Sequence, residues 1–565
     1  MRSFDNDPAV VRTDSRGQRA HFATVEHTQR LARKLYEVRP GVWSLIGNGL
    51  SNQTFILAPE GVIAIDTGES NEEMADAIAE LRKVSDAPLV AVLYTHFHYV
   101  GGTQGAFAEA GRDLPVYGHE RIPYNLSRVT SEIAPAYSSG LVHQFAMRLP
   151  DDGPDGLVND GLGLFFRNPD HAPFTPGFVP PTNTWRGGEV LTVAGLKLEV
   201  THAPSDANDS VTLWFPEIST CVQNLVWPAL FNIFAIRGEA YRDPQLLLTG
   251  IDHLLSLKPE HMVGTHGPPI SGADDIQARV TRYRDAIQLL WDQTVRGMNK
   301  GLSADEMAQS IRLPDTADDD YLTSELYGVA EHHVRQIAMG VRGWFDGDTS
   351  KLFPLEPVER AGRMVEAFGG VEALRSKVEA ARAENDIRWA LELASWLTTR
   401  KGAEQADRNL LAAVLRDVGY RSSAANIRNW CLTRARDLDG TQDLSRLREH
   451  RLRAHALKAM APREALHLIR VLFDPTRGAG LDLHIGFSFP DATSAGLHIR
   501  NGVSVATDGT GAAATVTLPY ALLVQVLAGQ ANLRAVIQQG EASVAGDQEA
   551  VLAALVCFDV PGFAA

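Results

Sequence analysis

Two histidines separated by one residue, His96 and His98, follow an apolar segment and precede a Gly-Gly pair at positions 101 and 102. The apolar segment, Pro88 to Tyr94, is typical of a buried strand. In an extended loop the side chains at i and i+2 point the same way, so both imidazoles could bind one cation. The glycines would allow the backbone to turn tightly beside such a site. The alternative for His-x-His by itself is a pair of surface histidines after a strand.

The composition is that of an ordinary globular protein with a marked negative charge. The chain has 565 residues, of which 44% are hydrophobic and 22% charged, and its formal net charge is −16 at pH 7. That length predicts about two to four domains. The net charge argues against nucleic acid and anionic membrane surfaces as partners, although a local cation could still attract a small anionic substrate. Three cysteines provide neither a disulfide framework nor a Cys-rich zinc site.

Neither a membrane span nor a secretion signal is expected. No run of about 18 apolar residues occurs, and the first 17 residues are polar and lack the apolar core of a signal peptide. We therefore expect a cytoplasmic protein. A periplasmic location would require a leader that precedes this sequence.

The elements that must position the two histidines belong to an α/β segment, residues 36–275, which follows a polar N-terminal arm, residues 1–35. An amphipathic helix is predicted from Glu72 to Val84. Residues 151–184 are rich in Gly, Pro and Asp, which is typical of a long loop near an active site. Strands are predicted at Val42–Ile46, Gln53–Leu57, Gly61–Ile65, Leu89–Tyr94, Val190–Val200, Val211–Phe215 and Met262–Gly264.

The remainder of the chain divides into an all-helical segment, residues 276–440, and a small α+β segment, residues 441–565. Neither contains metal-ligand spacing, and the adjacent His332 and His333 face apart on a helix, as in a packing pair. The helices predicted in the first of these segments are Ala304–Ile311, Glu325–Trp344, Glu359–Phe368, Val371–Glu384, Asp386–Lys401, Ala403–Val418 and Ser422–Leu438.

Several segments resemble the metallo-β-lactamase superfamily and, more narrowly, its bacterial alkyl sulfatases, which attack detergent-like sulfate esters. Gly49–Ile56 resembles the early strand of that family, and Val62–Gly68 resembles its next strand and Asp turn. Arg237-Gly238 followed by Tyr241–Asp243 resembles its substrate-side loop. The resemblance implies an αββα sandwich followed by a helical domain and a sterol-carrier-like domain.

The resemblance also covers the last two segments, so it extends over about residues 40–565. The helical segment resembles the dimerisation domain of the family, which implies a homodimer. The last segment resembles the sterol-carrier-like domain through Ile499–Val503 and Gly546-Asp547. The order of the three domains is more specific than any one motif.

The metal-binding loop departs from the family pattern His-x-His-x-Asp-His-x-Gly-Gly. Here the loop is two residues shorter, and both the Asp and the third His are absent. The family's bridging Glu before an Asn is replaced by Gln223 before Asn224. Loss of that negative charge weakens binding of a second cation, so one divalent ion is expected instead of two.

The resemblance implies a ligand set for that ion of His96, His98 and Asp206, with His266 as a remnant of the second metal position. Two imidazoles and one carboxylate suit catalytic zinc, which we favour, and also non-haem Fe(II). If Asp206 only caps a turn, Asp209 or His202 would take its place. His266 is either a metal ligand or a free acid/base.

The resemblance to sulfatases implies that metal-activated water attacks a sulfate ester of an alkyl alcohol. Arg237 would bind the sulfate group through its forked donors, unless it forms an ion pair with Asp243 or Glu239. Asn224 and Asn232 could donate further hydrogen bonds. Tyr99 could donate a proton or merely fill the space of the lost ligands. Trp227 and Phe231 could line an alkyl pocket or belong to the core.

Two other functions fit the same residues. The first is a mononuclear Fe(II) oxygenase that uses His96, His98 and Asp206, since that donor set is the one such oxygenases use. The second is a non-catalytic protein that binds a lipid or alkyl ligand and has a decayed metal site. Metal content and a screen of sulfate esters would distinguish the three, because fold alone is a weak guide to reaction class.

Overall fold

The computed structural model describes residues 3–564, with the side chains of residues 130, 448 and 455 left out. The chain forms two compact units. The first comprises residues Met1–Leu126 and Ser139–Asp443, and the second comprises Ser127–Ser138 and Leu444–Ala565. The boundary predicted after residue 275 lies inside the first unit. The domain boundaries therefore stay a prediction.

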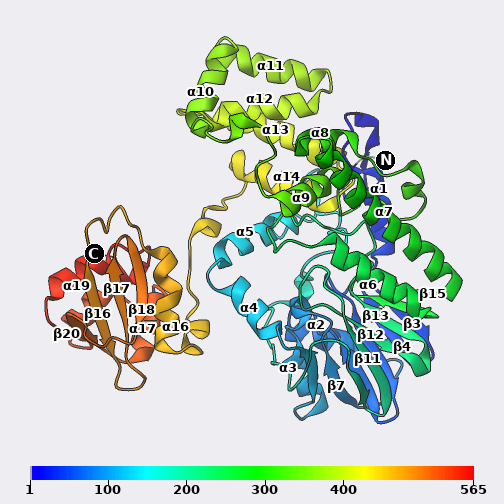
Figure 1. Ribbon diagram of the computed structural model, residues 1–565, viewed down its shortest axis with the longest axis horizontal. Coiled ribbons are helices and arrows are strands. Elements are labelled where there is room, and N and C mark those ends of the chain that lie inside the picture. The colour runs from blue at the N-terminus through cyan, green and yellow to red at the C-terminus, as the bar shows by residue number, and fades with distance from the viewer. Residues whose placement is uncertain (1–2, 565) are drawn as a thin grey trace. The chain divides into compact units, whose positions relative to one another are not determined.

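Two β-sheets pack face to face in the first unit and are covered by helices on both sides, which is the αββα sandwich that the resemblance implied. Their facing side chains, among them Ile63, Leu93, Val200 and Leu213, form one apolar core. Figure 1 shows helices α2 (Asn71–Leu81) and α3 (Thr103–Ala110) beside the blue sheet and α6 (Pro244–Leu257) on the other side of the sandwich.

The first sheet has seven strands in sequence order. Its first four strands pair antiparallel and the remaining ones parallel, so β6, β7 and β8 run the same way. Strand β6 is buried at all five positions, as expected of an apolar strand with layers on both faces. The strands are β3 (Lys34–Arg39), β4 (Val42–Ile46), β5 (Gln53–Ala58), β6 (Gly61–Ile65), β7 (Leu89–Leu93), β8 (Val116–His119) and β9 (Asn183–Trp185).

The second sheet has six strands, also in sequence order, and only β13 and β14 pair parallel. The segment predicted as one strand, Val190–Val200, is a hairpin, because Ala194 and Gly195 both adopt positive φ and turn the chain. The strands are β10 (Val190–Val193), β11 (Leu196–His202), β12 (Val211–Phe215), β13 (Thr220–Gln223), β14 (His261–Gly264) and β15 (Ile270–Ser271).

The N-terminal arm and the helical segment fold together in this unit. The arm contains a hairpin and a helix, and Thr24 Oγ1 donates to the Ser423 carbonyl over 2.8 Å. A long helix from Ala273 to Asn299, absent from the prediction, joins the sandwich to the helical segment. The elements are β1 (Val11–Thr13), β2 (Arg19–His21), α1 (Phe22–Arg30), α7 (Ala273–Asn299), α8 (Ala304–Ser310), α9 (Ala330–Arg342), α10 (Pro357–Ala367), α11 (Val371–Ala383), α12 (Ile387–Thr399), α13 (Gln405–Arg421) and α14 (Ala425–Leu438).

The second unit is the expected α+β fold, with a five-stranded sheet in the order β18-β17-β16-β19-β20 and its own apolar core. Its elements are α15 (Ala454–Lys458), α16 (Pro462–Leu468), β16 (Leu483–Ser488), β17 (Ala495–Arg500), β18 (Val503–Thr507), β19 (Ala514–Thr517), α17 (Tyr520–Leu527), α18 (Leu533–Gln538), β20 (Ser543–Ala545) and α19 (Gln548–Leu555). Between β8 and β9 lie α4 (Ile122–Thr130) and α5 (Ala134–Gln144), which the sequence did not predict. None of the helices within residues 3–564 has the length and apolar character needed to cross a membrane.

Glu73 on α2 carries a buried carboxyl group between two glycine positions. A Cβ atom on Gly49 or on Gly68 would overlap this carboxyl group, so both positions require glycine. The carboxyl oxygens accept hydrogen bonds from the Glu69 amide (3.0 Å) and from Gln53 Nε2 (2.8 Å). Burial nevertheless raises the pKa of Glu73 to about 8. Glu73 therefore retains its proton at neutral pH in the folded protein.

This shift predicts that the protein loses stability as the pH rises from about 5 to about 8. The unfolded chain releases the Glu73 proton near its ordinary pKa of 4.5, whereas the folded protein holds it up to about 8. By linkage the loss is on the order of 3 kcal/mol. The melting temperature of the wild type should fall relative to that of Glu73→Gln across this window. The exposed control Glu60→Gln should follow the wild type, and parallel curves for wild type and Glu73→Gln would contradict the assignment.

Candidate metal centre

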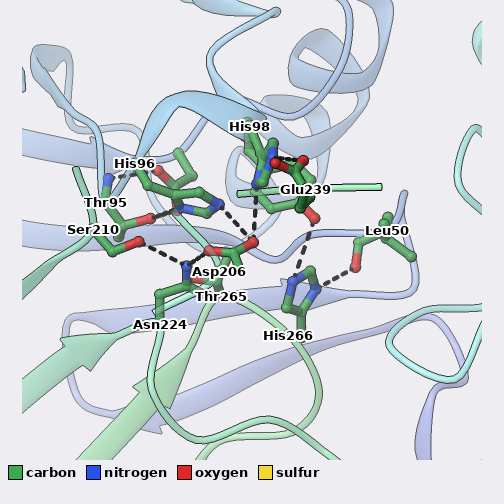
Figure 2. A network of polar contacts seen from close by, with 12 residues as sticks. Leu50, Thr95, His96, His98, Asp206, Ser210, Asn224, Glu239, Thr265 and His266 are labelled. Carbon is green, nitrogen blue, oxygen red and sulfur yellow. Dashed lines mark hydrogen bonds and ion pairs between the residues drawn. The ribbon is translucent and has the colours of Figure 1, made fainter. Parts of the chain in front are cut away.

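The side chains expected to bind a metal come from loops at the ends of both sheets. His96 and His98 follow β7, in a loop that contains a 3-10 turn at Phe97–Tyr99. Asp206 lies between β11 and β12. Figure 2 shows His96 and His98 converging on the Asp206 carboxylate, with His266 below them.

The loop after β7 is held close to the loop after β6 by its two glycines. A Cβ atom on Gly102 would overlap the Thr67 and Ser70 carbonyls, and one on Gly101 would overlap the Glu69 carbonyl. The Gly101 amide donates to the Gly68 carbonyl over 2.8 Å. Glycine is therefore required here for close approach of two backbone segments.

His96, His98 and Asp206 form a compact group of candidate ligands. One ligand atom of each lies within 4.8 Å of those of the others. Asp206 Oδ2 is 2.9 Å from His98 Nδ1 and 3.5 Å from His96 Nε2. His96 Nε2 is buried and has no hydrogen-bond partner among the described residues. An unpartnered imidazole nitrogen beside a carboxylate and a second imidazole fits a divalent metal ion such as zinc or iron.

A relay from Asp66 through Thr95 sets the tautomer of His96. Thr95 Oγ1 lies 2.7 Å from Asp66 Oδ2 and donates its proton to that carboxylate, which also accepts from the Thr95 amide over 2.8 Å. Since the hydroxyl has one proton, its 2.9 Å contact with His96 Nδ1 requires the histidine to donate. His96 Nε2 then faces the group of ligands, and it carries a lone pair whenever the ring is neutral. Such support orients metal-binding histidines.

The charges in the group favour a cation. Burial alone would raise the pKa of Asp206, but His96 and His98 outweigh it and hold this pKa well below its usual range. Burial opposes ionisation of His98, but Asp206 and Glu239 raise the pKa of His98 to about 9. The site thus holds a positive charge between its carboxylates, and a metal ion would replace the proton.

Asn224 positions Asp206. Its Nδ2 donates to Asp206 Oδ1 over 2.5 Å, and its Oδ1 accepts from Trp227 Nε1 over 3.0 Å. Both ends of the amide are therefore used within the protein, and the role of anion donor for Asn224 stays a prediction. Gln223 does not face the group, since its Oε1 accepts from the amides of Leu225 and Val226.

His266 lies apart from the three ligands and is paired with Tyr99. Its Nδ1 donates to the Leu50 carbonyl over 2.9 Å (Figure 2). Its Nε2 therefore accepts the hydrogen bond from the Tyr99 hydroxyl over 3.3 Å. Burial lowers the pKa of His266 to about 4, so the ring is neutral. The Tyr99 hydroxyl is thus hydrogen-bonded to His266 Nε2, the nitrogen that a second metal ion would need as a ligand.

Arg237 approaches the group and is paired with Glu239, one of the two acidic partners considered from the sequence. Nη2 of Arg237 lies 2.9 Å from Glu239 Oε1 and 3.5 Å from His98 Nε2. Glu239 is also 3.6 Å from His98 Nε2. The Arg237 guanidinium holds the pKa of Glu239 well below its usual range, against the effect of burial. Sequence reasoning missed Glu239 as part of the site, and its one signal was its place two residues after Arg237.

The remaining predicted residues lie near the group without joining it. Trp227 and Phe231 are fully buried in a large core cluster, with ring centroids 4.4 Å apart and ring planes tilted by 35°, and Trp227 is edge-on to His266 at 5.5 Å. Their burial favours the core over an alkyl pocket, although Trp227 also borders a small cavity beside His266. Of the two alternatives to Asp206, His202 contacts the Asn208 carbonyl over 2.8 Å, and Asp209 is buried outside the group.

Matches to protein families agree with this architecture. Residues 46–218 match the metallo-β-lactamase superfamily, which is the class that the sandwich and the site define. Residues 303–441 match the family "Alkyl sulfatase dimerisation", and residues 452–564 match "Alkyl sulfatase C-terminal".

Individual relatives narrow the class. A linear primary-alkylsulfatase of a Pseudomonas species is 33% identical over 523 residues, which cover 89% of this chain and 98% of the relative. An (R)-specific secondary-alkylsulfatase of Pseudomonas is 27% identical, over 91% of this chain and 79% of the relative. The solved structure of the stereoselective inverting sec-alkylsulfatase Pisa1 from Pseudomonas matches with a TM-score of 0.81 at 26% identity, over 94% of this chain and 86% of that one. The chain belongs to the alkyl sulfatase family.

The relay through Thr95 predicts an effect on metal affinity. Thr95→Val removes the hydroxyl that accepts from His96 Nδ1, so the tautomer is no longer fixed. Zinc affinity, measured by competition with a chromogenic chelator, should fall about 10- to 100-fold. The matched control is Thr212→Val, because Thr212 is buried in β12 and its hydroxyl has no partner. Equal zinc affinity in Thr95→Val and Thr212→Val would refute the relay.

Proposed function

We propose that this protein is a hydrolase that uses one divalent metal ion to cleave sulfate esters of linear alkyl alcohols. The observation that carries the proposal is the buried group of His96, His98 and Asp206, with an unpartnered His96 Nε2 at its centre. The names of the relatives support the substrate class, since they include primary and secondary alkylsulfatases.

A single ion is the better fit because the second position is closed by protein groups. The Tyr99 hydroxyl donates a hydrogen bond to His266 Nε2. The side-chain oxygen of Gln223 accepts a hydrogen bond from the Val226 amide and so faces a backbone turn. When bound, one zinc or iron ion supplies Lewis-acid chemistry that makes water a nucleophile near neutral pH. His96 Nε2, His98 Nδ1 and Asp206 Oδ2 would hold it. Zinc is the favoured ion.

The groups around this triad would position the substrate and move protons. Asn224 and the Thr95 relay keep Asp206 and His96 in place. The Tyr99 hydroxyl and His266 Nε2 share one proton, and they are the pair available for proton transfer on this side of the site. Arg237 carries positive charge beside His98, although Glu239 offsets it. These charged and polar groups therefore lie next to the candidate ligands, and the aromatic ring of Trp227 lies beside His266.

Metal content and sulfate release test this function together. We expect one zinc ion per chain by elemental analysis of the purified protein, and none above background in Asp206→Ala. The wild type should release inorganic sulfate from decyl sulfate, and Asp206→Ala should lose at least 10³-fold in kcat/KM, since the water nucleophile is no longer available. The control Asp113→Ala changes an exposed residue between α3 and β8, outside the site, and should retain activity. Two ions per chain would contradict the mononuclear site.

The second candidate function is an oxidative one, that of a mononuclear Fe(II) oxygenase. It is favoured by the arrangement of two imidazoles and one carboxylate around one position. Iron with oxygen-dependent turnover in anaerobically purified protein would favour an Fe(II) oxygenase over a sulfatase. Absence of stoichiometric metal, with ligand binding unaffected by His96→Ala, would instead indicate a non-catalytic lipid-binding protein.

We also propose that the protein is a homodimer through its helical segment. The segment 339–358, from the end of α9 to the start of α10, exposes a series of large apolar side chains, with Phe353 95% exposed. It lies within the match to the dimerisation family, residues 303–441. Several large apolar side chains exposed along one segment are typical of an interface. The members of the series are Met339, Val341, Trp344, Leu352, Phe353, Leu355 and Val358.

Phe353→Asp should therefore weaken the dimer, because it places a charge in an apolar contact. Light scattering after size-exclusion chromatography should show a dimer for the wild type and at least a tenfold higher dissociation constant for the variant. The control is Val190→Asp on β10, where the valine is 62% exposed outside the segment. A dimer equally stable in both variants would move the interface elsewhere.

A further inference from the structure

Each of the two candidate metal-binding histidines has one ring nitrogen that faces the group of ligands and one that faces away from it. For His96 the nitrogen that faces away is Nδ1, which the Thr95 hydroxyl and the Asp66 carboxylate hold. For His98 the order is reversed, because its Nδ1 lies 2.9 Å from Asp206 Oδ2. The group that contacts His98 Nε2 therefore decides how this ring is oriented.

Glu239 brings a buried carboxylate to His98 Nε2 (Figure 2). Its Oε1 lies 3.6 Å from this nitrogen, and its side chain is 9% exposed. The Arg237 guanidinium lies 2.9 Å from the same oxygen and holds the pKa of Glu239 well below its usual range, so the carboxylate is ionised and can only accept hydrogen bonds. Arg237 Nη2 is itself 3.5 Å from His98 Nε2, but a guanidinium cannot accept. Glu239 is therefore the acceptor that the described residues offer to a proton on His98 Nε2.

The backbone that carries Glu239 is fixed by a turn and by helix α5. Gly238 has a φ of 86°, and its amide closes the turn with a 2.9 Å hydrogen bond. A Cβ atom on Gly140 of α5 would overlap the Arg237 carbonyl, so the helix packs directly against this turn. Gln144 Oε1, also on α5, accepts from the Arg237 amide over 3.3 Å. Glu239 is thus held on a preorganised segment, as a residue that orients a metal ligand needs to be.

The position of Glu239 suits a histidine that binds a metal ion through Nδ1. A neutral imidazole carries one proton, and with Nδ1 on the ion that proton is on Nε2, which faces Glu239 Oε1. A carboxylate acceptor there makes the ring a stronger ligand and fixes its orientation. Arg237 opposes this effect, because it uses the same oxygen and adds a positive charge beside the ion. One carboxylate oxygen therefore serves both His98 and Arg237.

We propose that Glu239 is a positioning residue of the metal centre, which accepts a hydrogen bond from His98 Nε2 and so directs His98 Nδ1 at the ion, in competition with Arg237. The inference rests on the proposed function only for the presence of the metal ion. It adds a role for the Arg237–Glu239 pair in setting metal affinity. Substitutions of the two members of this pair should then change that affinity in opposite directions.

Zinc affinity of the full-length protein, measured by competition with a chromogenic chelator after the metal has been removed, tests this role. Glu239→Gln should bind zinc about 10- to 100-fold more weakly, and Arg237→Gln should bind it about tenfold more tightly, because Glu239 then serves His98 alone. The matched control is Glu80→Gln on α2, which breaks an ion pair of the same 2.9 Å length with Arg33 outside the site and should leave the affinity unchanged.

Glu239→Asp separates a hydrogen bond from a mere effect of charge. Aspartate keeps the negative charge but is one methylene shorter, so a positioning role predicts weakened zinc binding, whereas wild-type affinity in Glu239→Asp would overturn the proposal. Weaker zinc binding in Arg237→Gln would also overturn it. If Glu239→Gln fails to fold by circular dichroism, Glu239→Asp decides by itself, since it retains the ion pair's charges.

Cobalt substitution gives a readout at the hydrogen bond itself. In the cobalt(II) protein the Nε2 proton of His98 should give a proton NMR signal shifted by the ion, and Glu239→Asp should speed the exchange of this proton with solvent. Equal exchange rates would contradict the role of Glu239.

The same measurements separate this inference from the proposed function. Zinc affinity that depends on Glu239, without hydrolysis of decyl sulfate, refutes the function alone. Hydrolysis of decyl sulfate together with unchanged zinc affinity in Glu239→Gln and Glu239→Asp refutes the positioning role alone. A wild type that binds no zinc refutes both.

Discussion

The contacts of the Asp206 carboxylate with the imidazoles of His96 and His98 connect the two sheets of the sandwich at the candidate metal centre. His96 and His98 belong to the first sheet's loops and Asp206 to those of the second, and Asp206 Oδ2 lies within 3.5 Å of both rings. The sheets share one core, so their loop ends cannot drift apart. The Asp66 relay and Asn224 then fix each group from behind. A preorganised site of this kind depends on its supporting hydrogen bonds as much as on its ligands.

His266 is held by a neutral hydrogen bond at the place where the family resemblance implied a second metal ion. The chain has a glutamine at position 223 and a tyrosine at position 99, and neither brings a carboxylate to that place. Tyr99 is buried against His266, with ring centroids 5.3 Å apart. The tyrosine thereby satisfies His266 Nε2 without requiring any counter-charge. In the same region Glu239 brings a carboxylate to Arg237, so the local charge remains balanced.

Much of the fold and the ligand group could be predicted from the sequence, because both leave local patterns. His-x-His after a buried strand and before Gly-Gly pointed to His96 and His98, and the resemblance to the alkyl sulfatases implied Asp206. The hairpin at residues 190–202 was missed because its turn, Ala194-Gly195, is short and set in apolar residues. The direction of the Asn224 amide could not be predicted, since it depends on Asp206 and Trp227. Neither could the approach of Glu239 to His98, because contacts between distant loops leave no periodic signal.

The second compact unit combines residues 127–138, which come early in the chain, with residues 444–565. Within it, Glu132 forms a 2.8 Å ion pair with Arg470. During synthesis the ribosome therefore makes an early part of this unit well before the rest exists. A gene fragment that stops at residue 443 would leave this early part without its native neighbours. A deletion that removes the C-terminal unit therefore has to take account of both of its pieces, although its apolar core is formed by residues 452–563.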